Sequence, residues 1–268
     1  MPFPLAHPAA VLPLRRVPYL NFAALVIGSI TPDLSYCLER YRADILAHSL
    51  RGCLLFSLPV GWFIVGIFRA VAEPLMEVLP SAHRRALLPA CHSWNQPWFA
   101  VPVSVVIGAV THVILDGFTH ELGWWVERSS FLQWKLLVVS GHSFQVFRLL
   151  WHIASWGGLF LLWRAYARVL KDSGVPSRTA PEAAADRRRY ALWLGLLLPP
   201  LIPAGLMAYH HYAARLPSLA AIAKCLRLTA AIYLVLVALV LVAGGLAMRL
   251  RRRSHPCPVP SPDPGSGP

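Results

Sequence analysis

His112, Asp116 and His120 are spaced four apart in THVILDGFTHELGWW, residues 111–125, which lies at the end of an apolar stretch. On a helix, His112 and Asp116 share one face at a separation of about 6 Å, and His120 continues the row if the helix extends past Gly117. Imidazole and carboxylate groups at this spacing can reach one metal ion, or the carboxylate can orient the imidazole that holds it. The same pair could instead hydrogen-bond and hold two helices together.

Further residues of the same chemistry lie near the ends of apolar segments. Asp33 ends the apolar run GSITPD, His48 precedes another in AHSLRG, and His7 stands in LAHPAAV. Asp33 could simply cap a helix, and the histidines could be solvated at an interface. An ionisable residue inside a membrane segment costs roughly 2.5–3.5 kcal/mol, however, so we interpret these residues as candidates for one shared site.

The composition indicates the environment of these residues. Hydrophobic residues make up 56% of the 268 positions, and charged residues make up only 14%, against about 25% in soluble domains. The mean hydropathy is +0.53. We therefore predict an all-α, polytopic integral membrane helical bundle with about five or six transmembrane helices, and not a soluble helical domain.

Six apolar segments could supply the spans of such a bundle. They cover residues 20–38, 54–72, 98–118, 146–170, 190–209 and 228–248. Pro32 and Asp33 interrupt the first segment, and the count falls to five if that segment is a re-entrant or packed helix. We also expect a short interfacial helix over 8–17, and the tryptophans of 119–145 place that segment at the level of the lipid headgroups.

The distribution of positive charge predicts the orientation. The chain has a formal net charge of +13, and many of its arginines lie in the connector 171–189 and in the cluster 249–253. We therefore expect these two segments to be cytoplasmic. With six spans, we expect both termini to be cytoplasmic and Asp33, His48 and Asp116 to lie toward the extracytoplasmic side. No basic stripe alternates with aromatic residues, so the expected partner is the lipid bilayer and not nucleic acid.

Composition also suggests how the chain is divided. We predict a motif-bearing membrane domain with the candidate metal site over 1–170, a polar cytoplasmic linker over 171–189, a C-terminal transmembrane helix pair over 190–253 and a disordered tail over 254–268. The five cysteines are odd in number and include no CxxC pair, so neither a zinc knuckle nor a disulfide framework is expected.

Several motifs closely resemble the hallmarks of DUF4184, a bacterial membrane-protein family of unknown function. These motifs are MPFPLAHPAAVLPLRR, ALVIGSITPD, AHSLRGCLLFSLP and THVILDGFTHELGWWVER, and VFRLLWHIASWGGL resembles a further block. They follow the order of the family across about residues 1–165. The family itself implies no activity.

The chain is more distantly similar to the YdjM-type membrane-bound metal-dependent hydrolases, which are grouped with the zinc-dependent phospholipase C fold. The resemblance implies that this protein is located in the bacterial inner (plasma) membrane. That pattern has an N-terminal His, a Pro-Asp after an apolar helix, a His-Ser before the next helix, and a His-x-x-x-Asp. The matching positions are His7, Asp33, His48, His112 and Asp116, with Gly52 and Thr119 as nearby structural positions, whereas His120 matches only DUF4184.

The chain also departs from the hydrolase pattern. Where that pattern continues after Pro-Asp with another Asp and a His, this sequence has Leu34, Ser35 and Tyr36, so the resemblance implies one metal and not a multi-zinc centre. The predicted metal ligands are His7, Asp33, His48, His112, Asp116 and His120, and the predicted catalytic carboxylates are Asp33 and Asp116.

The resulting hypothesis is a membrane-embedded hydrolase. A divalent metal, zinc in the first instance because the ligands are His and Asp, would activate water for attack on a lipid or another phosphoester. Two alternatives remain open. One is a non-catalytic membrane protein with a structural metal site or an accessory role, and the other is a small transporter whose polar residues line a path.

Overall fold

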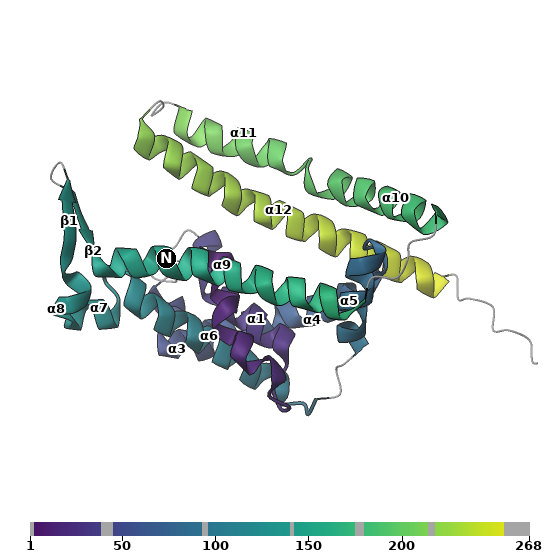
Figure 1. Cartoon of the computed structure of the whole chain (residues 1–268), viewed down its shortest axis with the longest axis horizontal. Coiled ribbons are helices and arrows are strands. Elements are labelled where there is room, and N and C mark those ends of the chain that lie inside the picture. The colour runs from purple at the N-terminus through teal and green to yellow at the C-terminus, as the bar shows by residue number, and fades with distance from the viewer. Residues whose placement is uncertain are drawn as a thin grey trace, which may run out of the picture. The chain divides into compact units, whose positions relative to one another are not determined.

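The computed structural model describes residues 3–38, 45–92, 96–139, 142–174, 180–213 and 218–254. The chain divides into two compact units (Figure 1). The first unit contains Met1–Ile67 and Arg85–Pro176, and the second contains Phe68–Arg84 and Ser177–Pro268. Two helices, α4 (Leu58–Glu77) and α5 (Ser81–His92), contribute residues to both units.

The first unit contains most of the predicted motifs. Its other elements are the 3-10 helices η1 (Pro4–Arg16) and η2 (Thr31–Leu38), the π-helical turn η3 (Cys53–Ser57), the α-helices α1 (Phe22–Ile30), α3 (Leu50–Gly52), α6 (Ala100–Thr119), α7 (Trp124–Arg128), α8 (Ser130–Gln133) and α9 (Val146–Asp172), and the strands β1 (Lys135–Val139) and β2 (His142–Gln145). The two strands form an antiparallel pair in which Val139 lies opposite His142. This small hairpin is an addition to the helical architecture that the sequence did not predict.

The second unit contains α10 (Ala180–Leu197), α11 (Leu201–Tyr212) and α12 (Leu219–Ser254), of which α11 and α12 pack together. Asp186 of α10 is buried and accepts hydrogen bonds from the backbone N–H and the hydroxyl of Ser81, at 2.8 and 2.6 Å. These bonds satisfy donors at the start of α5. Because α10 begins at Ala180, the segment predicted as a linker over 171–189 includes a helix start.

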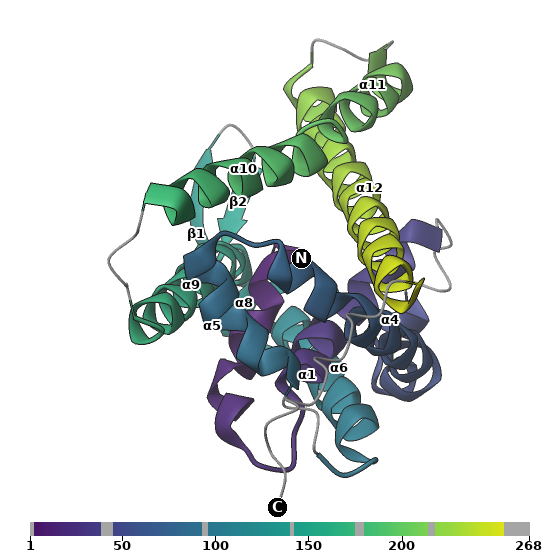
Figure 2. The same ribbon diagram turned by 90° about the vertical axis from the view of Figure 1, so that its right-hand side faces the viewer.

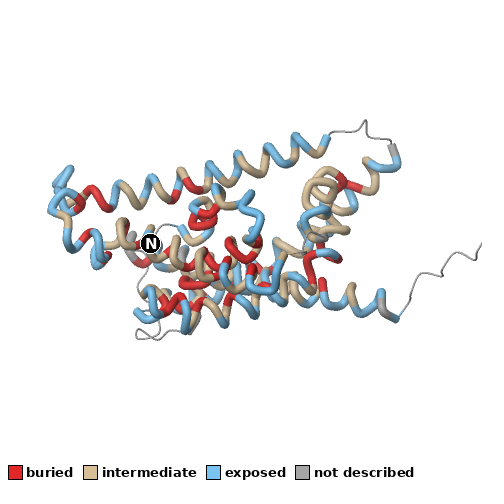
Figure 3. Tube along the Cα trace, turned by 90° about the horizontal axis from the view of Figure 1, so that it is seen from below, coloured by how far each residue is buried: buried red, intermediate tan, exposed pale blue. Residues whose placement is uncertain are grey.

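Five helical segments of the described residues are long and apolar enough to cross a membrane. They are Leu50–Glu77, Ala100–Thr119, Val146–Asp172, Pro181–Tyr212 and Ala221–Arg252. Large apolar side chains on them are open, as Phe63, Trp156 and Trp163 show with 70%, 71% and 65% of their surface exposed. Figure 3 shows buried positions as short stretches among exposed and half-buried ones. Apolar surface on this scale requires a lipid environment, and the predicted all-α polytopic bundle is confirmed.

Among the described residues, the segment 20–38 does not form a helix of transmembrane length, so five of the expected five or six spans are found. The α-helix α1 ends at Ile30, and the chain continues as the tighter 3-10 helix η2. Pro32 has no N–H to continue the α-helical ladder, which accounts for the change. The cytoplasmic position of both termini stays a prediction.

The N-terminal helix η1 packs within the first unit, against α9 and α1, although a short interfacial helix was expected over 8–17. The backbone N–H of Phe3 donates to the hydroxyl of Ser155 at 3.0 Å. A Cβ at Gly158 would lie 2.9 Å from the carbonyl oxygen of Ala6, so the two backbones are in close contact. This packing buries His7 completely.

A second close contact joins α1 and α6, which lie side by side (Figure 2). Cβ atoms at Gly28 and Gly108 would lie 2.2 and 2.3 Å from carbonyl oxygens of the opposite helix. Only glycine permits this approach, as at other tight helix crossings in membranes. The backbone N–H of Asn21 donates to the hydroxyl of Ser104 at 2.8 Å, while the Asn21 side chain caps α1. The start of α1 is thereby held beside Ser104 and its later part beside Gly108.

Candidate metal centre

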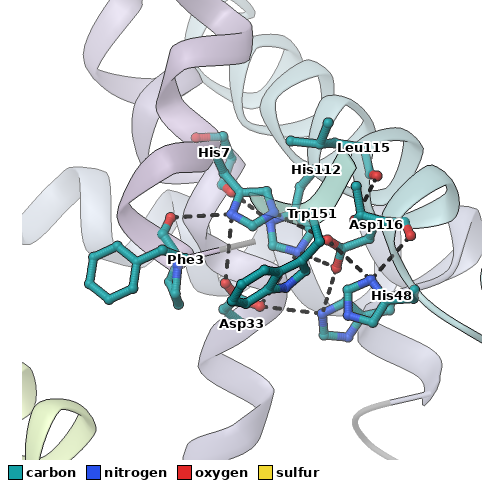
Figure 4. A network of polar contacts seen from close by, with 12 residues as sticks. Phe3, His7, Asp33, His48, His112, Leu115, Asp116 and Trp151 are labelled. Carbon is teal, nitrogen blue, oxygen red and sulfur yellow. Dashed lines mark hydrogen bonds and ion pairs between the residues drawn. The ribbon is translucent and has the colours of Figure 1, made fainter. Parts of the chain in front are cut away.

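Four of the predicted ligands come together in the first unit. Asp33 lies on η2, His48 precedes α3, and His112 and Asp116 lie one turn apart on α6. Each residue offers one ligand atom, and these four atoms all lie within 4.8 Å of one another. Figure 4 shows the side chains directed toward one another. The described residues therefore contain a His/Asp cluster that could hold a metal ion.

The tautomer of His112 follows from its surroundings. Its Nδ1 lies 2.8 Å from the carbonyl oxygen of Ser29, which can only accept, so Nδ1 carries the hydrogen. In the neutral ring, Nε2 then presents a lone pair. Metal-binding histidines are commonly oriented in this way, by donating their other N–H to a backbone carbonyl.

The lone pair of His112 Nε2 faces two carboxylates. The atom lies 3.2 Å from Asp116 Oδ2 and 3.5 Å from Asp33 Oδ1. Despite these short separations, neither His112 Nε2 nor Asp116 Oδ2 has a hydrogen-bond partner among the described residues. Acceptors that face one another in a buried site are costly unless a cation lies between them. This arrangement therefore fits a bound metal ion.

The distances among the donor atoms agree with that fit. His48 Nε2 lies 3.4 Å from Asp33 Oδ1 and 3.7 Å from Asp116 Oδ2. An ion with four ligands at about 2.1 Å in tetrahedral geometry separates neighbouring donors by about 3.4 Å. Two imidazole nitrogens with two carboxylate oxygens suit zinc, and also manganese or ferrous iron.

His7 contacts the cluster from η1 but lies outside the four-residue group. Its Nε2 lies 3.2 Å from Asp116 Oδ1, and its Nδ1 lies 3.3 Å from the carbonyl oxygen of Pro4. The His7 ring also stacks on that of His112, with 3.9 Å between the centroids. A neutral His7 ring has one N–H and donates either to the carbonyl oxygen of Pro4 or to Asp116 Oδ1. Donation from Nε2 to Oδ1 orients the carboxylate so that Oδ2 remains available to the centre.

His120 lies at the carboxyl end of α6, immediately after the helix ends at Thr119. Its Nδ1 lies 3.1 Å from the carbonyl oxygen of Asp116 and 3.5 Å from Asp116 Oδ1. Burial lowers the pKa of His120, and the negative charge of Asp116 opposes that shift. A neutral ring that donates from Nδ1 caps the helix at this position.

Exposure differs across the cluster and indicates where solvent enters. The side chains of His7 and His112 are fully buried, and those of Asp33 and Asp116 nearly so. By contrast, 18% of the His48 side chain and 30% of the His120 side chain are exposed. The described ion-pair partners of both carboxylates are all histidines, so no lysine or arginine there offsets their charge.

Two contributions to the site carry no signal in the sequence. The carbonyl group of Ser29 orients His112, that of Pro4 lies beside His7, and a backbone carbonyl is available at every position of any chain. The polar network also includes Trp151 of α9 (Figure 4), whose carbonyl oxygen accepts from the hydroxyl of Ser155 at 2.8 Å. Only the packing of η1, α1 and α9 around α6 identifies these partners.

The comparison with protein families agrees with the first resemblance. The model of DUF4184, a domain of unknown function, matches residues 1–244. Because this match covers most of the chain, the protein belongs to the DUF4184 family. No curated protein and no solved structure matches the chain. The resemblance to YdjM-type hydrolases therefore stays a prediction.

Proposed function

We propose that this DUF4184 protein is a membrane-embedded hydrolase that holds one divalent metal, zinc in the first instance, between Asp33, His48, His112 and Asp116. The supporting observation is that two hydrogen-bond acceptors face each other in a buried site. His112 Nε2 and Asp116 Oδ2 lie 3.2 Å apart without a hydrogen bond. Two buried carboxylates opposed only by histidines also favour a bound cation.

The residues of the cluster have distinct roles in this proposal. A divalent cation supplies a more acidic water and polarises a phosphoryl oxygen. Asp33 has a second oxygen, Oδ2, without a hydrogen-bond partner among the described residues, so it can accept the proton of the attacking water. His7 and Ser29 keep Asp116 and His112 in place, and the exposed edges of His48 and His120 border the entry.

The position of the cluster suggests a lipid or another phosphoester as the substrate. Asp116 lies three residues before the end of α6, which corresponds to about 5 Å along the helix. In a membrane-crossing helix this position would lie close to the headgroup layer. The charge distribution favours the extracytoplasmic face of the bacterial plasma membrane for that layer.

A structural metal site is the second candidate, and it has an observation of its own. Four protein donors, with histidine-to-carboxylate separations of 3.2 to 3.7 Å and all within 4.8 Å of one another, would be enough for a tetrahedral structural zinc site, whereas catalytic zinc keeps a position open. The exposed edge of His48 favours a catalytic site, because a purely structural centre needs no access to solvent.

Metal content provides the first test. The full-length protein is purified in detergent, supplied with zinc, manganese or ferrous iron, desalted and measured by mass spectrometry of the elements. We expect about one metal per chain in the wild type and loss of that metal in His112→Ala and Asp116→Ala. His210→Ala, on an exposed residue of α11, is the matched control and should keep it. No stoichiometric metal in the wild type, or equal content in all variants, contradicts the proposal.

Activity then separates the two candidates. The metal-loaded protein is assayed on phosphodiester model substrates and on phospholipid vesicles for release of soluble product. A hydrolase should lose its activity in His112→Ala and after chelation, and His210→Ala should retain it. Stoichiometric metal that stabilises the protein without any product release across the panel supports the structural site instead.

A further inference from the structure

A basic cavity lies between η1 and α9, within the first unit and apart from the metal centre. It has a volume of about 500 Å³. The residues that line it are Ala9, Leu12, Pro13, Arg15, Arg16, Leu161, Arg164, Ala165 and Arg168. We propose that this cavity binds the headgroup of an anionic phospholipid from the leaflet that contains the basic end of α9.

The four arginines meet there because η1 and α9 run side by side in the same direction. Phe3 contacts Ser155 and Ala6 contacts Gly158, so the end of η1 is brought to Arg164 and Arg168. These two arginines are four residues apart and share one face of α9.

The described residues do not compensate the charge of this cavity. No carboxylate lines it, and none of its four arginines has an ion pair or a hydrogen bond among the described residues. Four like charges gathered at one cavity repel each other, so an anion that enters it relieves this repulsion. Guanidinium groups match phosphate oxygens with pairs of parallel N–H donors.

The apolar part of the lining favours a lipid over a free anion. Leu12 and Leu161 offer a surface for the glycerol and the first methylene groups of an acyl chain. The cavity also belongs to a candidate membrane span, on which Trp163 is exposed one residue before Arg164. Exposed tryptophan followed by arginine is typical of the headgroup level, where basic pockets between helices bind acidic lipids.

Lipid retention by the full-length protein in neutral detergent tests this proposal. The probes are phosphatidylglycerol and phosphatidylcholine, added at equal concentration and followed by native mass spectrometry. We expect the wild type to retain phosphatidylglycerol preferentially, and Arg164→Ala with Arg168→Ala to weaken that retention by about tenfold or more. Arg164→Lys with Arg168→Lys should give an intermediate loss, because the charge stays and the paired donors are removed.

Arg187→Ala with Arg188→Ala is the matched control, since it removes the same charge from exposed positions of α10. It should keep the preference for phosphatidylglycerol. An equal loss in this control, or no preference in the wild type, overturns the proposal. Displacement of the lipid by millimolar inorganic phosphate also overturns it, because the cavity would then be a general anion site. Metal content should be the same in all these variants.

Discussion

His112 Nε2 lies 3.2 Å from Asp116 Oδ2, and the two atoms do not form a hydrogen bond. The relationship is notable because the residues are one turn apart on α6, where a histidine and an aspartate could readily pair. The hydrogen of His112 is instead committed to the carbonyl oxygen of Ser29 at 2.8 Å. Because α1 packs against α6, His112 Nε2 and Asp116 Oδ2 both present acceptors, and they do not form a hydrogen bond that would hold two helices together.

The first prediction concerns Asp116→Asn. The amide has nearly the size of the carboxylate, but its NH2 group can donate to the lone pair of His112 Nε2. The variant should therefore bind metal far more weakly and, compared with metal-free wild type, be more stable by about 1 kcal/mol, or roughly 2–4 °C in Tm. Metal analysis and thermal unfolding in excess chelator measure the two effects.

The control for this substitution is Asp186→Asn, which also removes one buried carboxylate. Asp186 accepts from Ser81 and Arg189, so its replacement should lower the Tm and leave metal content unchanged. If Asp116→Asn lowers the Tm of the metal-free protein as well, the Asp116 carboxylate already accepts hydrogen bonds from donors in the wild type. The proposal that it faces the lone pair of His112 Nε2 is then wrong.

The second prediction concerns pH. Burial lowers the pKa of His120, so the unfolded chain binds a proton there at a higher pH than the folded chain does. The free energy of unfolding should therefore fall as the pH drops from about 6.5 toward the lowered pKa, and this contribution is fully present above about pH 6.5. Thermal unfolding of metal-free wild type and His120→Gln over pH 5 to 8 measures it.

His120→Gln is informative because its amide can still donate to the helix end. Wild type should lose more stability than the variant between pH 7 and pH 5. Parallel curves for the two proteins would show that His120 is not protected from protonation in the folded state. His210→Gln, exposed on α11, should follow the wild-type curve.

The sequence was sufficient for the helical membrane class and for the cluster residues, because apolar length and the i, i+4 spacing act locally. For 20–38 it left two possibilities open, because Pro32 and Asp33 interrupt an apolar run of transmembrane length, and the structure shows that α1 ends at Ile30 and continues as η2. The sequence also did not predict that His7 and His120 lie outside the four-residue cluster. Their positions depend on the carbonyl of Pro4 and on where α6 ends, and both are consequences of tertiary packing.

The third prediction tests the contact between α1 and α6. A Cβ at position 108 would lie 2.3 Å from the carbonyl oxygen of Leu25, and backbone cannot rotate away as a side chain can. Gly108→Ala should therefore cost about 1–3 kcal/mol and weaken metal binding, because Asp33 and Ser29 move relative to His112. Thermal unfolding and metal titration of the purified variant provide both readouts.

Gly66→Ala is the matched control on α4, since a Cβ there meets no atom within 4 Å. It should leave metal binding unchanged and raise stability slightly, by up to about 1 kcal/mol, through helix propensity. A Gly108→Ala protein that behaves like this control would mean that α1 and α6 are not in backbone contact.

The fourth prediction concerns the side of the membrane on which the metal centre lies. With the basic ends of α9 and α12 in the cytoplasm, we expect Ser130 of α8 to be extracytoplasmic and Ser254 of α12 to be cytoplasmic. Each position is changed to cysteine in a chain whose five native cysteines are replaced by alanine. A membrane-impermeant maleimide should label the cysteine at 130 in intact cells, and that at 254 only after permeabilisation. The reverse pattern places the centre at the cytoplasmic face.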